Sequence, residues 1–312
     1  MRRRRVVGLT LVAVLVLLLA WPVGLLIWAN GKINHIPALS DAANTPGTTY
    51  LLAGSDARGS GGVYDETAGA RTDTIMLLHK PDSGPTALIS LPRDTFVEIP
   101  GHGGNKLNAA FSIGGAPLLV QTVEQLTGLT IDHYVEVGFG GVGDVVDAVG
   151  GVQLCSDLTV TNDKSNLEWT PGCHEVDGQT AIAFVRMRYS DPKGDIGRAE
   201  RQRQLISVLS HDVADPGLLL HPGRQVSLLD AGLGALTVSD GTGIIDLARL
   251  GLAFRAANGP DGITGTPPIS NLNFRPGGIG SAVQLDPATI DQFWADLRDG
   301  NLPPGVVGGM PS

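Results

Sequence analysis

The run TDTIMLLHKPDSGPTALISLPRD, residues 72–94, sets the pattern from which the rest of the chain can be interpreted. Two apolar segments in it, Thr74–His79 and Thr86–Ser90, are separated by the turn Pro81–Pro85. Short apolar runs bounded by proline and glycine predict buried strands. Just upstream, Thr49–Ala53 has the same character and predicts a further strand. We therefore expect a β-sheet in this part of the chain.

Strands and helices alternate further along the chain. We predict strands at Phe96–Ile99, Ile131–Val137 and Val152–Leu154, and helices at Asn108–Ile113, Ala116–Leu126, Gly143–Val149, Ile244–Ala257 and Asp286–Leu297. Pro287 is expected in the first turn of the last helix, where proline is tolerated. Such alternation predicts an α/β fold, with a mixed central sheet flanked by helices on both faces as a three-layer αβα arrangement.

Composition narrows the class of protein. The chain has 312 residues, enough for a sizeable core, and its 43 Gly and 20 Pro predict many turns. A formal net charge of -9 argues against general nucleic-acid binding, which needs a broad basic surface. The sequence has no Walker loop, nucleophile elbow or His-Glu-x-x-His motif, so it does not support an NTPase, hydrolase or zinc-protease interpretation.

The N-terminal end predicts a membrane anchor. Residues 1–5 form a basic tail, and residues 6–29 carry no charge and are long enough to span a bilayer. The positive flank predicts a single-pass protein with a cytoplasmic N-terminus. Residues 30–47 are expected to be a linker and residues 48–312 an extracytoplasmic domain. The alternatives are a cleaved signal peptide, and packing of part of 30–47 as a first strand or helix.

The chain has two cysteines, Cys155 and Cys173, which are 18 positions apart. In an extracytoplasmic domain they are expected to form a disulfide, which would contribute about 3 kcal/mol by loop closure. Unpaired or metal-binding thiols are the alternatives.

Charged side chains gather at the ends of successive predicted strands. They are Asp56, Arg58, Arg71, Asp73, Arg93 and Asp94. Ligand sites of α/β sheets form at strand ends, and a pair of carboxylates such as Asp56 and Asp73 suits Mg²⁺. Either acid taken alone would be explained as a turn or cap residue.

A second arginine-rich stretch spans Ala183–Leu209. Alternation over residues 183–188 predicts a strand with Arg186 and Arg188 on one face, and residues 198–209 predict a helix. Arg198 and Gln202 share one side of that helix at i, i+4. Guanidinium groups gathered in this way suit phosphate oxygens, whereas the alternative is a solvated, ion-paired surface.

Two further arginines of the helix, Arg201 and Arg203, turn away from the Arg198–Gln202 line, and we interpret them as structural.

A series of short motifs links these features. In chain order they are DAR at 56–58, RTDT at 71–74, SLPRD at 90–94, KLNAAF at 106–111, GGV at 150–152, DGQ at 177–179, VRMR at 185–188, DIGR at 195–198 and RQ at 201–202. Over residues 48–209 this series closely resembles the LytR-CpsA-Psr family.

The resemblance implies a phosphotransferase that moves a glycopolymer from a polyprenyl-pyrophosphate carrier to peptidoglycan at the membrane. It implies Mg²⁺, or alternatively Mn²⁺, at Asp56 and Asp73. The residues implied to clamp the pyrophosphate are Arg58, Arg71, Arg93, Arg186, Arg188, Arg198 and Gln202. Arg93, Asp195 and Arg198 are implied to act at the reacting centre.

Other interpretations remain open. The chain could be a membrane-anchored regulator or sensor that binds lipid-linked precursors without catalysis, or a pyrophosphatase acting on the same carrier. Asp94 or Asp195 could be the general base, or could orient an arginine. Residues 118–126 and 131–149 could line a lipid slot, with core packing as the alternative.

Overall fold

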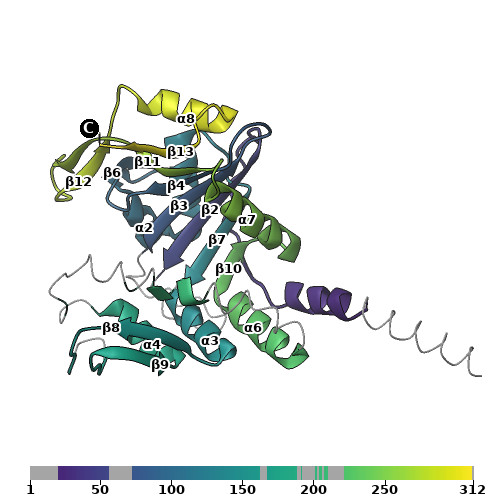
Figure 1. Cartoon of the computed structure of the whole chain (residues 1–312). Helices are drawn as coiled ribbons and strands as arrows, with labels where there is room; N and C mark the ends of the chain where they lie inside the picture. Colours follow the sequence, from purple (N-terminus) through teal and green to yellow (C-terminus); the bar gives the residue numbers. More distant parts are fainter. Residues whose placement is uncertain are drawn as a thin grey trace, which may run out of the picture.

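A computed structural model of the chain describes residues 20–55, 72–161, 167–187, 191, 201, 204–205, 207–209 and 221–310. A nine-stranded sheet forms its centre (Figure 1). In spatial order its strands are β1 (Asn34–Ile36), β10 (Leu236–Ser239), β7 (His133–Gly138), β2 (Thr48–Ser55), β3 (Thr72–Lys80), β4 (Ala87–Leu91), β11 (Ile263–Phe274) and β12 (Ala282–Leu285), with β13 (Gly305–Gly309) paired to β11.

The sheet is mixed, as the sequence predicts. Strand β2 runs parallel to β7 and antiparallel to β3, and β4 runs antiparallel to β3 and parallel to β11. Apolar residues alternate along these strands, so that each central strand has buried side chains on both of its faces.

Helices cover both faces. On one face, α2 (Leu107–Thr127) and α8 (Ile290–Asp299) pack on side chains such as Leu51 and Leu77. On the other face, α7 (Ile244–Ala257) packs on Tyr50 and Leu78, and α6 (Pro222–Gly234) packs beside Val135. The predicted layering is therefore confirmed.

A smaller unit has its own apolar core. It comprises α3 (Phe139–Val149), the hairpin of β8 (Val152–Ser156) and β9 (Gly172–Val176), and α4 (Gly178–Arg186). The disulfide Cys155–Cys173 joins β8 to β9, where the two residues are register partners, so the predicted pairing is present. A second hairpin, β5 (Phe96–Ile99) with β6 (Gly103–Lys106), precedes α2.

Some predicted helix boundaries are confirmed and others are wrong. Helix α7 has the predicted bounds, and Gly128 ends α2 in the left-handed conformation that favours glycine. The two helices predicted within 108–126 merge into α2 with non-helical dihedrals at Gly114 and Gly115. The predicted start of the last helix is wrong: Asp286 accepts hydrogen bonds from Ala288 N and the Thr289 hydroxyl, so residues 287–289 form a turn and α8 begins at Ile290.

The segment 30–47, predicted as a linker, contributes to the fold. Its strand β1 pairs in parallel with β10, and Ile36 and Ala38 are buried in the main core. Upstream, Ala29 and Ile33 are buried in a cluster with Leu233 of α6. The structure thus has the arrangement of the alternative, in which part of this segment packs as a first strand.

The regions 118–126 and 131–149, weighed as walls of a lipid slot, supply core residues. Leu119, Val123 and Tyr134 are all fully buried in the main cluster. Core packing accounts for these side chains.

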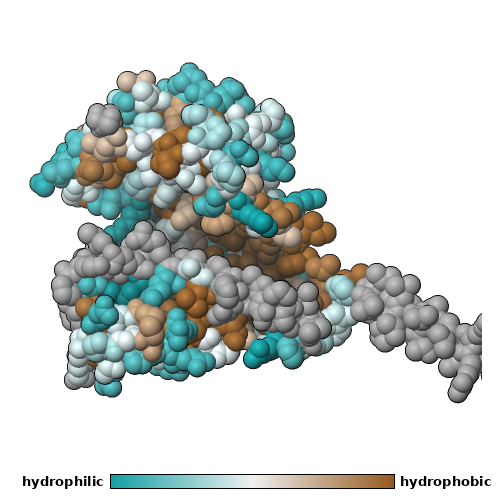
Figure 2. Space-filling view, in the orientation of Figure 1, coloured by the Kyte–Doolittle hydropathy of each residue, from teal (hydrophilic) through white to brown (hydrophobic). Residues whose placement is uncertain are grey.

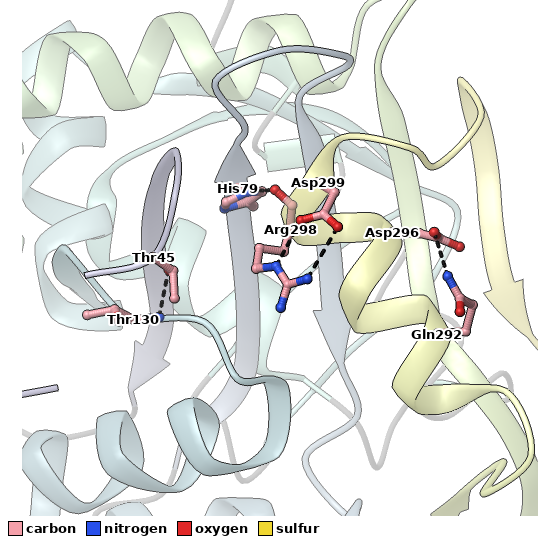
Figure 3. Close-up of polar contacts among 7 residues, drawn as sticks. All are labelled: Thr45, His79, Thr130, Gln292, Asp296, Arg298 and Asp299. Atoms are coloured by element: carbon pink, nitrogen blue, oxygen red, sulfur yellow. Dashed lines mark hydrogen bonds and ion pairs between the residues drawn. The ribbon is translucent and has the colours of Figure 1, made fainter. Parts of the chain in front are cut away.

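Figure 3 shows how α8 is tied to the sheet at the end away from the carboxyl ends of β2 and β7. His79 Nε2 on β3 lies 3.3 Å from the Arg298 carbonyl, and His79 Nδ1 lies 3.0 Å from the Thr49 hydroxyl. A carbonyl only accepts, so Nε2 carries the proton and Nδ1 accepts from the hydroxyl. Burial lowers the pKa of His79, which keeps the ring neutral.

Among the residues that the structure describes, no helix is both long and apolar enough to cross a membrane. Most of the predicted span, residues 6–19, lies outside them. The anchor therefore stays a prediction.

Candidate functional site at one edge of the sheet

Four strand ends meet at one edge of the sheet. Ser55, the last residue of β2, pairs with Gly138 at the end of β7 and with Thr72 at the start of β3. Ile75 pairs with Leu91 at the end of β4. The carboxyl ends of β2, β4 and β7 therefore lie together with the amino end of β3. In Figure 1 this edge lies toward the unit of α3, α4, β8 and β9.

The predicted acids and arginines flank these ends in the chain. Asp73 lies in β3 next to Thr72, although its side chain lies outside what the structure describes. Asp56 and Arg71 are the chain neighbours of Ser55 and Thr72. Further predicted residues also fall outside the described part of the chain: Asp56, Arg58, Arg71, Arg188, Asp195, Arg198, Gln202 and Arg203. Their assignments stay predictions.

The turn after β4 holds Arg93 against the start of α2. Thr95 donates to the Pro92 carbonyl through both its amide, at 2.9 Å, and its hydroxyl, at 2.6 Å. The Arg93 carbonyl accepts from Asn108 N at 3.0 Å, and the Thr95 carbonyl accepts from Leu107 N at 2.8 Å. The first amides of a helix need such acceptors, so α2 fixes the turn that carries Arg93.

Asp94 lies between two cations in this turn. Its Oδ1 is 2.9 Å from Lys106 Nζ, and its Oδ2 is 3.6 Å from Arg93 Nε. All three side chains are partly exposed. Asp94 therefore orients a lysine and an arginine at the rim of the sheet edge.

Lys106 was not predicted to act at the site, although it belongs to the motif KLNAAF. Lys106 and Phe96 are register partners in the β5–β6 hairpin, which brings the lysine back to Asp94. The hairpin partner of Phe96–Ile99 was not predicted, so nothing in the sequence pattern showed that Lys106 and Asp94 are neighbours.

The prediction that residues 183–188 form a strand is wrong. Residues Gly178–Arg186 form helix α4, and Asp177 caps it by accepting from Thr180 N at 2.8 Å. The hydrogen bonds from Thr180 lower the pKa of Asp177, so the cap stays ionised at neutral pH. Arg186 lies exposed in the last turn, and the chain leaves the helix at Met187 with ψ 134.

The sequence of residues 178–188 contains both the helical spacing and the strand spacing of apolar residues. Ala181, Phe184 and Val185 are buried at i, i+3 and i+4, as a helix requires, while the alternation around Arg186 imitated a strand. The cap at Asp177 was the local signal that favoured the helix.

Arg201 has the structural role that its helical position predicted. Its Nε donates to the Phe184 carbonyl at 2.9 Å, its Nη2 donates to the Met187 carbonyl at 2.6 Å, and its Nη1 pairs with Asp191. Both Arg201 and Asp191 are buried. The guanidinium closes the C-terminal end of α4 and fixes the chain that continues from Arg186.

Strand β7 brings a buried acid near the same edge. Glu136 lies two positions before the end of β7 and is 9% exposed. Its Oε2 accepts from the Tyr134 hydroxyl at 2.9 Å. Glu136 was not predicted as a site residue, because a glutamate in a strand with the alternation of β7 is ordinarily exposed.

The described residues hold no cluster of three or more His, Cys, Asp or Glu side chains that could bind a metal ion. Neither predicted metal ligand, Asp56 nor the Asp73 carboxylate, is among the side chains searched.

Comparison with known proteins agrees with the arrangement of the fold. The model of the LytR_cpsA_psr family matches residues 29–237. The chain is similar to the probable cell wall biosynthesis protein LcpB of Corynebacterium glutamicum, at 41% identity over 304 residues, covering 94% of this chain and 69% of LcpB.

The chain is also similar to the polyisoprenyl-teichoic acid–peptidoglycan teichoic acid transferase TagU of Enterococcus faecalis. The two are 42% identical over 159 residues, and the match covers 51% of each protein. The chain thus spans about half the length of this relative. A LytR-Csp2A-Psr enzyme from Actinomyces oris has the same fold, with a TM-score of 0.57 at 19% identity, covering 85% of this chain and 95% of that one.

Proposed function

This chain belongs to the LytR-CpsA-Psr family, and from that premise we propose that it is a membrane-anchored phosphotransferase of cell-wall assembly. It moves a glycopolymer from a polyprenyl-pyrophosphate carrier onto peptidoglycan. The transferase name of the related TagU supports this substrate pair. The observation that carries the proposal is the meeting of four strand ends at one edge, since three of the four predicted acids and several predicted arginines flank those ends in the chain.

The proposed location is the outer side of the membrane. Residues 6–29 anchor the chain with its N-terminus in the cytoplasm, and the domain lies outside. The disulfide Cys155–Cys173 supports this location, because disulfides persist in oxidising compartments.

The donor set at the edge fits a hard divalent cation. Asp56 directly follows Ser55, Asp73 directly follows Thr72, and Ser55 and Thr72 are register partners on neighbouring strands. Two carboxylates at paired strand ends suit Mg²⁺ or Mn²⁺, and we propose that Asp56 and Asp73 hold it. When bound, the ion neutralises charge on the pyrophosphate.

The arginines of the clamp stabilise the negative charge that develops during the transfer. An acceptor hydroxyl on peptidoglycan attacks the phosphorus next to the polymer, and a new P–O bond forms. The bond from this phosphorus to the bridging oxygen breaks, and polyprenyl monophosphate leaves with the electron pair. Arg93, Arg186, Arg198 and their neighbours in the clamp hold the developing negative charge.

The proton of the acceptor hydroxyl passes to a base, for which Asp94 and Asp195 are the candidates. The two ion pairs of Asp94 support an orienting role for it instead.

The test is a transfer assay with the full chain in detergent micelles. Truncation at residue 48 is avoided, because it would remove β1 and the buried Ile36. The assay contains Mg²⁺, a polyprenyl-pyrophosphate oligosaccharide, and peptidoglycan in one of two arms. We expect polymer on the acceptor, and Asp73→Ala and Arg93→Ala should abolish it. A single lost clamp contact is worth about 2–4 kcal/mol of transition-state stabilisation.

Arg275→Ala is the matched control, because Arg275 is an exposed arginine whose described contact is Asn273. Its activity should equal that of the parent chain. Release of polyprenyl phosphate without any acceptor would identify a pyrophosphatase instead. Tight binding with no phosphate released in either arm would identify a sensor and refute the transferase.

A further inference from the structure

Helix α7 has an apolar stripe on the side that faces away from the sheet. Ile245 and Leu252 are 61% and 69% exposed, and the exposed Ala248 and Ala256 continue the same line at i, i+3, i+7 and i+11. The opposite side of α7 is buried against the sheet through residues such as Ala253. A solvent-facing stripe of this kind needs a partner, because exposed leucine and isoleucine in a row are costly in water.

Two arginines border the stripe. Arg249 and Arg255 are both exposed, one on each side of the Ile245–Leu252 line. Arg249 pairs with Asp246 at 3.1 Å but keeps 69% of its side chain exposed. An apolar stripe with flanking arginines is typical of helices that lie in a membrane interface, where the stems bury and the guanidinium groups reach lipid phosphates.

A second group of exposed apolar side chains lies on the helix of residues 20–30, whose end contacts the first turn of α7. Of the large apolar side chains that are exposed in the described residues, four lie on this helix, namely Trp21, Val23, Leu26 and Ile27. Figure 2 shows the hydrophobic residues gathered over α7 and this helix. Residues 20–30 overlap the end of the span predicted at 6–29, so the patch lies where the chain is expected to meet the bilayer.

The two helices are fixed to one another. Asn30 Oδ1 accepts from Ile244 N at 3.0 Å, at the first turn of α7. Trp28 and Ala29 pack in one cluster with Leu247 and Leu250 of α7. The two parts of the patch are therefore held together by direct contacts between residues 28–30 and α7.

We propose that this patch, formed by the outward side of α7 and the exposed residues of 20–30, docks on the outer leaflet of the membrane, with Arg249 and Arg255 binding anionic lipid headgroups. The docking holds the sheet edge at a fixed orientation to the bilayer, because α7 also packs on the strands that end there. This inference rests on the membrane anchor of the proposed function, but not on its chemistry.

The test places one fluorescent label on the full chain. Both native cysteines form the disulfide, so an engineered cysteine is the single labelling site. Leu252→Cys reports on the stripe, and Leu272→Cys is the matched control, a leucine 57% exposed on β11. The labelled chains are reconstituted in liposomes that contain anionic phospholipid, with brominated lipid or aqueous iodide as the quencher.

We expect brominated lipid to quench the label at 252, and iodide to quench only the label at 272. Arg249→Gln with Arg255→Gln should reduce the lipid quenching at 252, and so should replacing the anionic lipid by a neutral one. If iodide quenches the labels at 252 and 272 equally while the chains still float with the liposomes, the docking is refuted and the anchor is not.

Two other outcomes would also overturn the proposal. Cross-linking of two chains through Leu252→Cys would show that a second copy covers the patch. Failure of the full chain to float would remove the anchor and the docking together. Neither outcome alters the transfer assay in detergent, so each is distinguishable from failure of the proposed chemistry.

Discussion

Replacing Arg201 by methionine should destabilise the fold more than replacing any exposed arginine. The guanidinium makes three polar contacts, to the carbonyls of Phe184 and Met187 and to the carboxylate of Asp191, and its Cζ lies 5.8 Å from the centroid of the Phe184 ring. Its side chain is only 7% exposed and that of Asp191 only 3%. Methionine preserves much of the length of the side chain but supplies no donor and no charge.

The expected loss of unfolding free energy follows from the groups that lose Arg201 as their partner. Removing one partner of a buried ion pair costs about 3–5 kcal/mol, because the other charge stays buried after its counter-ion is lost. The two carbonyls at the end of α4 lose donors in the same truncation, and this loss falls within that range. Since whole domains are stable by only about 5–15 kcal/mol, Arg201→Met should be marginally folded at physiological temperature.

The assay is urea unfolding of the full chain in micelles, followed by circular dichroism. Arg298→Met is the matched control, because the Arg298–Asp299 pair is 40% and 47% exposed and such pairs contribute about 0–1 kcal/mol. The double variant Arg201→Met/Asp191→Asn should recover part of the loss, because no buried charge remains. A loss below about 1 kcal/mol in Arg201→Met, or no recovery in the double variant, would refute the reasoning.

Three further perturbations have defined outcomes. Replacing Cys155 and Cys173 by serine should cost about 3 kcal/mol of unfolding free energy, and reductant should then no longer change the melting temperature. Burial lowers the pKa of His79, so the unfolded chain binds the extra proton. Stability should therefore fall as the pH drops below about 6.5, by up to ~1.4 kcal/mol per pH unit, and His79→Gln should make this decline shallower in urea titrations at several pH values. Gly178→Ala should cost about 1–3 kcal/mol of unfolding free energy, measured by calorimetry. A Cβ at this position would lie 2.1 Å from the Gly143 carbonyl oxygen and would push α3 away from α4. Gly223→Ala is the control and should be tolerated, because the space around Gly223 is open.

The strands of the sheet could be predicted from sequence where the local pattern of apolar residues is unambiguous. The segments Thr49–Ala53 and Thr74–His79 are apolar on both faces, and a run that short and that apolar has few alternatives to a buried strand. Helix α7 was predicted with its observed bounds for a related reason. Its buried residues Ala253 and Ala257 lie at i, i+4, and no proline interrupts the helix.

Prediction failed where a local signal is ambiguous or is overridden. Residues 183–188 fit both the helical and the strand period, and Arg201, which is distant in sequence, donates to the Met187 carbonyl where the helix ends. Strand β11 was not predicted, because it contains Gly265, Pro267 and Pro268, which ordinarily mark loops. Pairing on both sides, with register shifts beside the prolines, keeps that segment extended.

The missed strands also matter for the site. The family model ends at residue 237, and the last motif ends at residue 202, so the sequence pattern gives no reason to connect the C-terminal third with the strand ends. In the structure, Val283 N of β12 donates to the Asp94 carbonyl at 2.8 Å, and Val283 forms a bridge with Thr95. The turn that carries Arg93 is thus held by α2 on one side and by β12 on the other. Because β12 itself depends on β11, the geometry of Arg93 and Asp94 is set in part by residues far outside every recognisable motif. A chain truncated before β11 would therefore retain all the motif residues but lose the orientation of this turn.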